Sequence, residues 1–386
     1  LTRTLVAAKS EVISTKTGGD ILLQLMFLML EPNAQTDRVL NSPTNDAWLY
    51  PWYDYLIKTL GIDYQKNHTG IEILFDEKNE VITGVKVQDA KGTIKTVTGD
   101  YYIFAVPVER MSELLKKTPT LEKSDKTLSF IHQLSPCTSW MTGIQFYLNK
   151  ELAMPQGHTI YTDTPWALTS ISQVPFWKNF DINQYGNGKT KAIFSIDVSD
   201  WFTNGIIYNK PASKCTKEEI KTEVWEQLKR SLIDEHGKPL LTDDMLVDWY
   251  LDRDITFNDQ NFVTGNEEPL LINQVNTWAL RPEAYTAINN MFLASDYVRT
   301  HTDLATMEGA NEAARRATNA ILKASKSSAP LCEIWDLHEP SLLAIYRWWD
   351  KRRWQQGLPW ENKFPFWLQV INAVWYFIKW LINKIF

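Results

Sequence analysis

The residues best suited to chemistry lie where a strand gives way to a helix. An apolar strand, Met291–Ala294, ends in Ser295 and Asp296. Ligands of open α/β sheets bind at the carboxyl ends of the strands, and a carboxylate there can accept hydrogen bonds from sugar-type hydroxyls. A helix follows over 306–322. Its N-terminus offers free N–H groups and partial positive charge to an anion, or to a carbonyl oxygen that gains negative charge.

This helix carries small residues on its inner face, which are Gly309, Ala310, Ala313, Ala314, Ala317 and Ala320. Small side chains let a backbone or a planar ligand approach closely. We therefore expect a flat cofactor against the start of the helix. The pattern alone leaves an alternative open, which is a tight helix–sheet contact with Asp296 as a helix cap.

Two apolar runs predict the sheet that positions this site. Tyr101–Val106 has no polar face, and Met291–Ala294 repeats the pattern. Such runs are typical of strands buried on both sides, in a parallel sheet under helices. Because these two strands bracket a long middle segment, that segment is predicted to be a second domain inserted into the first, within an α/β protein.

Local patterns predict the remaining elements. Alternation and turn signals indicate a β-meander with strands over Ile71–Phe75, Val81–Gln88 and Thr93–Thr98. A helix is predicted over Val108–Lys117 and another over Thr216–Ile233, where Thr216 is suited to cap the N-terminus. Trp140–Leu148 and Lys191–Val198 are predicted strands of the middle segment.

A long, ordered motif resembles a known family. Phe292–Tyr297, followed by Thr306–Ala310 and Arg315–Ala317, resembles the C-terminal flavin signature of the FAD-dependent amine oxidase and phytoene desaturase superfamily. Ser295 stands where that family usually has glycine. Tyr102–Pro107 is similar to the family's strand that returns to the FAD domain.

The resemblance implies FAD as the cofactor and gives several residues a role. Asp296 would hydrogen-bond the ribityl or pyrophosphate part of FAD. The N–H groups near Met307 and Glu308 would face the flavin pyrimidine carbonyl, and the helix dipole would stabilise the reduced, anionic flavin. The other residues assigned to FAD are Ser295, Thr306, Gly309, Ala310, Ala105, Pro107, Ile71 and Arg281. For Arg281 a surface or capping role is the alternative.

The fold implied is a Rossmann-like FAD-binding domain without its N-terminal part, an inserted α+β substrate domain and a C-terminal amphipathic helix. The expected segments are 1–60 (linking helices of the substrate domain), 61–116 (part of the FAD domain), 117–265 (substrate domain), 266–330 (end of the FAD domain) and 331–386 (Trp-rich tail). Segment 41–62 is similar to the helix and turn that enter the FAD domain in phytoene-desaturase-like proteins.

The family's first FAD motif, a GxGxxG turn after an N-terminal strand, is absent from these 386 residues. Gly18 and Gly19 lack the spacing, and Gly186–Gly188 has no strand before it. The chain also starts with Leu1 rather than methionine. We expect that the motif is truncated or lies on a second chain; loss of flavin is the remaining alternative.

The tail over 364–386 is the second strong feature. Polar residues at steps of three and four form one stripe on an apolar helix, and they are Gln369, Asn372, Tyr376, Lys379 and Asn383. A basic, aromatic collar suited to headgroups precedes it, formed by Trp348, Trp349, Lys351, Arg352, Arg353, Trp354 and Trp360. A helix lying in the membrane interface is expected. A helix buried in the protein or an oligomer, and a true membrane span, are the alternatives.

Composition excludes several classes of function. The net charge of -6 gives no reason to expect nucleic acid. Three cysteines without a CxxC argue against a metal site and a disulfide scaffold. No acid–base set stands out, because the histidines are scattered: His132, His158, His236, His301 and His338. His301 is nearest the flavin signature, and the catalytic residues stay unidentified.

These features predict a membrane-associated flavoenzyme on the cytoplasmic or organelle stromal face. We expect hydride transfer from an isoprenoid or other lipid to FAD. Two alternatives stay open: a flavoprotein that isomerises or hydrates double bonds without net oxidation, and a non-catalytic membrane subunit that pairs with a GxGxxG-containing chain. Amine oxidation is less favoured, because the tail points to a lipid.

Overall fold

The computed structural model describes residues 2–30, 39–155, 157–178, 180–337, 344–359 and 364–385. Contacts divide the chain into two units, Leu1–Leu337 and His338–Phe386, and each is described by itself. Some positions discussed above fall outside the description, namely His338, Trp360 and the side chains of Tyr376, Lys379 and Asn383.

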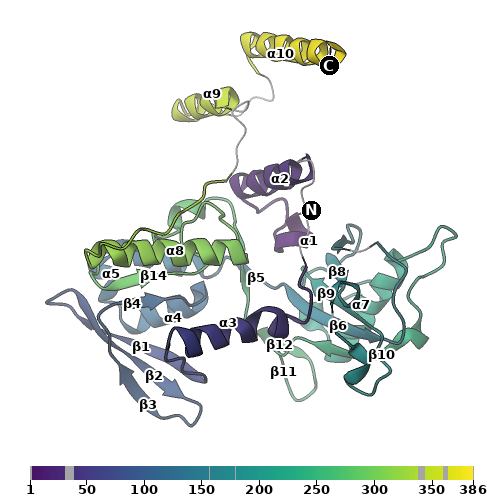
Figure 1. Cartoon of the computed structure of the whole chain (residues 1–386), viewed down its shortest axis with the longest axis horizontal. Coiled ribbons are helices and arrows are strands. Elements are labelled where there is room, and N and C mark those ends of the chain that lie inside the picture. Colours follow the sequence, from purple (N-terminus) through teal and green to yellow (C-terminus); the bar gives the residue numbers. More distant parts are fainter. Residues whose placement is uncertain are drawn as a thin grey trace. The chain divides into compact units, whose positions relative to one another are not determined.

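A five-stranded antiparallel sheet forms the first core of the larger unit (Figure 1). Its strands, in spatial order, are β10 (Leu246–Leu251), β6 (Thr142–Leu148), β9 (Ala192–Val198), β8 (Leu168–Ser172) and β7 (Thr159–Ile160). Residues of β6 and β9 alternate between buried and half-buried, so one face of the sheet packs in a core with helix α7 (Lys217–Ser231). Thr216 caps α7, as predicted, in a capping box with Glu219.

The opposite face of this sheet is polar. The Tyr147 hydroxyl donates to Gln145 Oε1 at 3.1 Å, and Gln145 Nε2 donates to Ser195 Oγ at 3.2 Å. Asp197 lies on the same face, and burial raises its pKa. This face is therefore equipped to contact a ligand rather than a second apolar layer.

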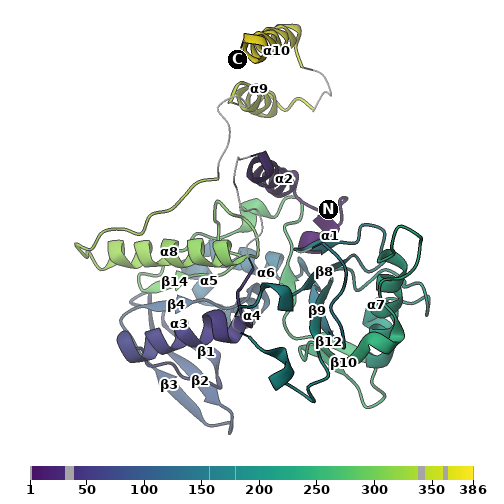
Figure 2. The same cartoon turned by 45° about the vertical axis from the view of Figure 1, so that its right-hand side comes forward.

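A second core surrounds a parallel strand pair, β4 (Tyr102–Phe104) and β14 (Met291–Leu293). In Figure 1 the pair lies between helices α8 (Met307–Ala324) and α4 (Val108–Lys117), and Figure 2 shows the same elements turned by 45°. Leu121 of α5 (Leu121–Ser124) and Leu134 of α6 (Phe130–Leu134) belong to this core. The predicted meander is present as β1 (His68–Asp76), β2 (Val81–Asp89) and β3 (Ile94–Val97).

The prediction that Tyr101–Val106 is buried on both sides is wrong. Tyr102 and Phe104 are buried, whereas Ile103 is 49% exposed. Backbone groups of Tyr102 and Phe104 pair with β14, so those of Ile103 face the opposite edge, where no strand of the described residues pairs with them. A run of apolar residues does not distinguish an open edge strand from a central one.

The remaining elements of this unit are short or weakly packed. A helical run over 45–59, with α3 (Tyr50–Asp54) between two π-helical turns, has no buried residue. The other elements are helices α1 (Thr2–Val6) and α2 (Thr15–Leu30), and the strand pairs β5 (Thr138–Ser139) with β13 (Leu270–Leu271) and β11 (Ile255–Phe257) with β12 (Val263–Asn266). The chain is thus a mixed α/β protein, as predicted; the Rossmann-like arrangement, the inserted domain and the five segment boundaries stay predictions.

The smaller unit contains two helices, α9 (Ala344–Gln355) and α10 (Phe366–Ile385). Trp349 and Trp367 pack edge to face, with ring centroids 5.7 Å apart. Most described side chains of α10 are exposed although they are apolar, including Phe366, Val374 and Phe377. None of the helices in the described parts of the chain has the length and hydropathy to cross a bilayer.

Candidate functional site

The carboxyl ends of β4 and β14 each lead to an acidic residue. β14 is followed by Ser295 and Asp296, and β4 by Pro107 and Glu109, the second residue of α4. Because the two strands are parallel, their carboxyl ends lie at the same edge. Both carboxylate oxygens of Glu109 are buried and have no hydrogen-bond partner among the described residues.

The electrostatics of these two acids are unfavourable in the protein alone. Burial raises the pKa of Asp296, opposed by a hydrogen bond from the Ser295 hydroxyl at 3.2 Å and by the charge of Arg281. Burial also raises the pKa of Glu109, and the negative charge of Asp296 adds to this effect. Two carboxylates with so few donors are suited to a ligand rich in hydroxyl groups.

The N-terminus of α8 supplies the complementary groups. The Thr306 hydroxyl accepts a hydrogen bond from the Gly309 N–H at 3.1 Å, which caps the helix. The N–H groups of Met307 and Glu308 have no acceptor among the described residues. Met307 and Ala310 are exposed, so this end of the helix is open to a ligand.

A buried polar cluster holds the segment between β14 and α8. Arg281 and Asp303 are each 2% exposed, and Arg281 Nε lies 3.2 Å from Asp303 Oδ1. Arg281 also donates to Asn273 Oδ1 at 2.8 Å and to the backbone carbonyl of Asp296. The Thr17 hydroxyl donates to Asp303 Oδ2 at 2.7 Å. Arg281 thus orients Asp296 through its backbone, and a contact of Arg281 with the cofactor stays a prediction.

The other predicted site residues are spread along α4. Ala105 is exposed and Pro107 directly precedes α4, so both lie at the carboxyl end of β4 with Glu109. Ile71, in β1, is found near the opposite end of α4, because its carbonyl accepts a hydrogen bond from Lys117 Nζ at 2.9 Å. The structure brings Ala105, Pro107, Ser295 and Asp296 to one edge and leaves Ile71 away from it.

Two features of this region were not predicted from the sequence. Glu109 was not a candidate, although an acid directly after a strand and a proline is a usable signal. The second feature is a hydrogen-bonded Ser–His–Glu series, which no spacing in the sequence indicates. Ser112 Oγ lies 2.8 Å from His132 Nδ1, and His132 Nε2 lies 2.8 Å from Glu122 Oε1. These three residues connect helices α4, α5 and α6. Because Ser112 is only 1% exposed, its hydroxyl is not accessible to a substrate. His301 pairs with Asp336 at 3.1 Å on the surface.

An apolar cavity of about 160 Å³ lies beside the N-terminus of α8. Thr306, which caps that helix, is part of its wall, as are Thr17 and Asn273 of the buried cluster. The rest of the wall is apolar, and most of it is contributed by Leu5, Val6, Ile13, Met141, Leu270, Leu271, Ile272 and Leu304. A cavity of this kind can hold part of an apolar molecule.

These observations test the fit of FAD. The ribityl and ribose hydroxyls of FAD are donors. The carboxylate of Glu109 lacks a donor among the described residues, and the carboxylate of Asp296 has the Ser295 hydroxyl. The pyrimidine carbonyls of FAD are acceptors, which the N–H groups of Met307 and Glu308 lack. The residues present therefore fit the hydroxyl-bearing and carbonyl-bearing parts of this cofactor. The acids do not suit the pyrophosphate, because like charges repel.

The match to a protein-family model agrees with this assignment. The family model for flavin containing amine oxidoreductase matches residues 54–322, more than half of the chain. A comparison with curated protein sequences finds no match. Among solved structures, the chain is similar to an oxidoreductase from Methanosarcina mazei, with a TM-score of 0.48 and 10% identity, over 83% of this chain and 62% of that chain. The protein belongs to the flavin containing amine oxidoreductase family, whose cofactor is FAD.

Proposed function

We propose that the protein is an FAD-dependent oxidoreductase that dehydrogenates an apolar substrate, an isoprenoid or another lipid, at a membrane surface. The observation that carries this proposal is the apolar cavity that meets the capping residue of α8, Thr306. A substrate chain seated there would lie next to the helix end suited to the flavin. None of the described residues that line the cavity has an ionisable side chain, which favours an uncharged substrate.

The residues of this chain would hold and tune the cofactor. Asp296 and Glu109 would accept hydrogen bonds from its hydroxyls, and the N–H groups of Met307 and Glu308 would donate to a ring carbonyl. Bound FAD would supply the acceptor for a hydride. The partial positive charge at the start of α8 would stabilise negative charge at that carbonyl, and the apolar cavity would exclude water from a bound substrate.

A matched pair of variants tests the substrate class. Ile13→Trp fills the cavity, whereas Val12→Trp adds the same side chain at a neighbouring position that is 41% exposed. We expect a long-chain isoprenoid to bleach the flavin absorbance without oxygen in the wild type and in Val12→Trp, but not in Ile13→Trp, which retains FAD. Bleaching by Ile13→Trp at the wild-type rate would refute the proposed position of the substrate. Product formation without net redox turnover would select the isomerase or hydratase instead.

The smaller unit supports the membrane surface as the place of action. Exposed apolar side chains of α10, such as Trp375, Phe377 and Trp380, would enter the interface. Arg352 of α9 lies 5.7 Å from the Trp348 ring, a pairing suited to the headgroup region. We expect the full chain, but not a chain lacking 338–386, to sediment with lipid vesicles. A shortened chain that still sediments would refute the role of the tail.

The open edge of β4 supports a second polypeptide segment as a partner. No described strand pairs with the backbone edge at Ile103, and Trp52 and Tyr55 of the 45–59 run are also exposed. Parallel sheets of only two strands with exposed edges are rare. A further parallel strand, followed by the glycine-rich turn that binds phosphate, would complete the sheet of β4 and β14. Ile103→Pro removes the edge N–H and should abolish FAD retention, whereas Ile103→Val should not. Full FAD retention by Ile103→Pro would exclude this partner.

A further inference from the structure

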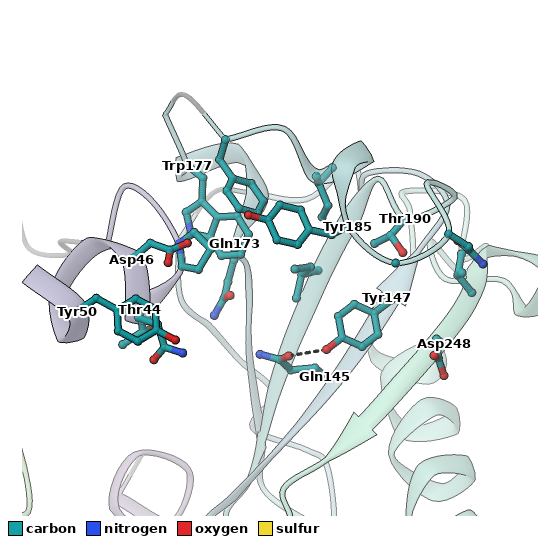
Figure 3. A pocket seen from close by; sticks show the side chains of 18 residues that line it. Thr44, Asp46, Tyr50, Gln145, Tyr147, Gln173, Trp177, Tyr185, Thr190 and Asp248 are labelled. Atoms are coloured by element: carbon teal, nitrogen blue, oxygen red, sulfur yellow. Dashed lines mark hydrogen bonds between the residues drawn. The ribbon is translucent and has the colours of Figure 1, made fainter. Parts of the chain in front are cut away.

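The polar face of the five-stranded sheet opens into a pocket that none of the predicted flavin residues lines (Figure 3). Its volume is about 640 Å³, which is in the range of small-molecule sites. The start of the 45–59 helical run forms one wall, with Asp46 and Tyr50. Gln145 and Tyr147 of β6 form the facing wall, and residues between 173 and 190 close the top.

Aromatic rings dominate this pocket. Trp177 and Phe180 lie edge to face with centroids 4.7 Å apart, and Phe180 stacks on Tyr185 at 4.9 Å. Tyr50 and Tyr147 add rings from the two walls (Figure 3). The face of an aromatic ring carries negative potential and attracts a cation.

The charges of the pocket have one sign. Asp46 and Asp248 line it, and no lysine, arginine or histidine is among the described lining residues. Neither carboxylate takes part in an ion pair with a described residue. Burial raises the pKa of Tyr147, and the negative charge of Asp248 raises it further. The charge of Asp248 therefore acts on Tyr147 inside the pocket. Amide oxygens of Gln145 and Gln173 add neutral acceptors.

We propose that this pocket binds a soluble organic cation, a quaternary or protonated ammonium with apolar substituents. Five aromatic rings attract such an ion by cation–π interaction, and two carboxylates that form no ion pair with a described residue attract it by Coulomb interaction. The two carboxylates repel anions. The ammonium group needs no hydrogen-bond donor from the protein. This inference is independent of the flavin, because the pocket and the flavin-binding residues share no side chain.

Calorimetric titration of the full chain with choline, and with the neutral isostere in which carbon replaces its quaternary nitrogen, tests the proposal. We expect choline to bind about 10-fold more tightly than the isostere. Asp248→Asn and Asp46→Asn should each weaken choline binding about 3-fold, and raised salt should weaken it further. Asp259→Asn, an equal charge change at an exposed position outside the pocket, should leave binding unchanged.

Asp46 lies in the first helical turn of the 45–59 run, so its variant also alters the helix end. Asp248, in β10, has no such role and gives the cleaner comparison. Trp177→Leu, checked for an unchanged melting temperature, should reduce choline binding about 10-fold by removing the central ring. Equal binding of choline and its isostere, or an Asp46→Asn/Asp248→Asn double variant that binds choline like Asp259→Asn, would overturn the proposal.

Discussion

A methyl group on Gly309 would lie 2.3 Å from the carbonyl oxygen of Leu304. The close approach of the turn before α8 therefore requires glycine at position 309. A bound cofactor would be a second reason for a small residue there. The same contact places the free N–H groups of Met307 and Glu308 at the site. The geometry of the flavin end of the helix thus depends on a backbone-to-backbone approach.

Gly309→Ala should destabilise the protein by about 1–3 kcal/mol, because the added carbon forces the turn apart. FAD retention should fall with it, since the helix end moves. Gly19→Ala is a suitable control, because it is also a helical glycine but has no atom within 4 Å of the added carbon. That control should raise the free energy of unfolding by about 0.5–1 kcal/mol. Chemical denaturation of both variants decides the matter, and equal behaviour would contradict the proposed contact.

Asp296→Asn should stabilise the flavin-free protein and weaken FAD binding. The pKa of Asp296 is raised in the folded state, so the folded protein binds this proton more tightly than the unfolded chain. Stability is lost as the pH rises from the unfolded pKa through the folded one, and the penalty persists at neutral pH. Removing the charge should raise the free energy of unfolding at pH 7 and flatten this part of the pH profile.

Thermal melting of flavin-free protein between acidic and neutral pH measures this effect. Glu109→Gln should behave in the same direction, because burial raises its pKa as well. A structural cap would give the reverse result. If Asp296→Asn lowers the melting temperature at pH 7 and leaves FAD content unchanged, Asp296 is a cap and not a cofactor residue.

Arg281→Ala should cost about 3–5 kcal/mol, because it removes the buried ion-pair partner of Asp303 and leaves the longer ion pair with Lys16, at 3.9 Å. Asp303 also has a φ of 46°, a left-handed conformation that the cluster must hold in place. The double variant Arg281→Met/Asp303→Leu should cost much less than the sum of the single variants. Urea unfolding of the four proteins gives the coupling energy, and strictly additive losses would argue against the pair.

Substitution of Glu223 should destabilise the protein about as much as substitution of Arg281, although Glu223 lies far from the proposed flavin site. Its carboxylate accepts from the backbone N–H groups of Ile207 at 2.9 Å and Tyr208 at 3.2 Å, and it is fully buried. Glu223→Ala should destabilise the first core by about 3 kcal/mol by leaving these donors unpaired. FAD content at low temperature should be unchanged, and a selective loss of FAD would contradict this separation of roles.

Local sequence patterns predicted the elements that depend on local physics. Helix α4 has the predicted bounds and Thr216 caps α7, because periodicity and capping act over a few residues. The parallel pairing of β4 with β14 was also expected from the matched apolar runs. These elements carry most of the predicted flavin residues.

Long-range contacts were not predictable in the same way. Glu109 lies at the same sheet edge as Asp296 only because two strands that are far apart in the chain pair in parallel. The burial of Arg281 depends on Asp303, Asn273 and Thr17, which come from separate segments. The exposure of Ile103 depends on which strand lies next to β4. None of these relationships leaves a periodic signal in the sequence.

The most direct test is the FAD content of the protein as isolated from cells that make it, measured by flavin fluorescence after denaturation. The account predicts stoichiometric FAD in the wild type, a large loss in Asp296→Ala, and little change in Asp259→Asn. A wild-type protein without flavin, or Asp296→Ala with its full complement of FAD, would contradict the claim that the start of α8 and Asp296 hold this cofactor.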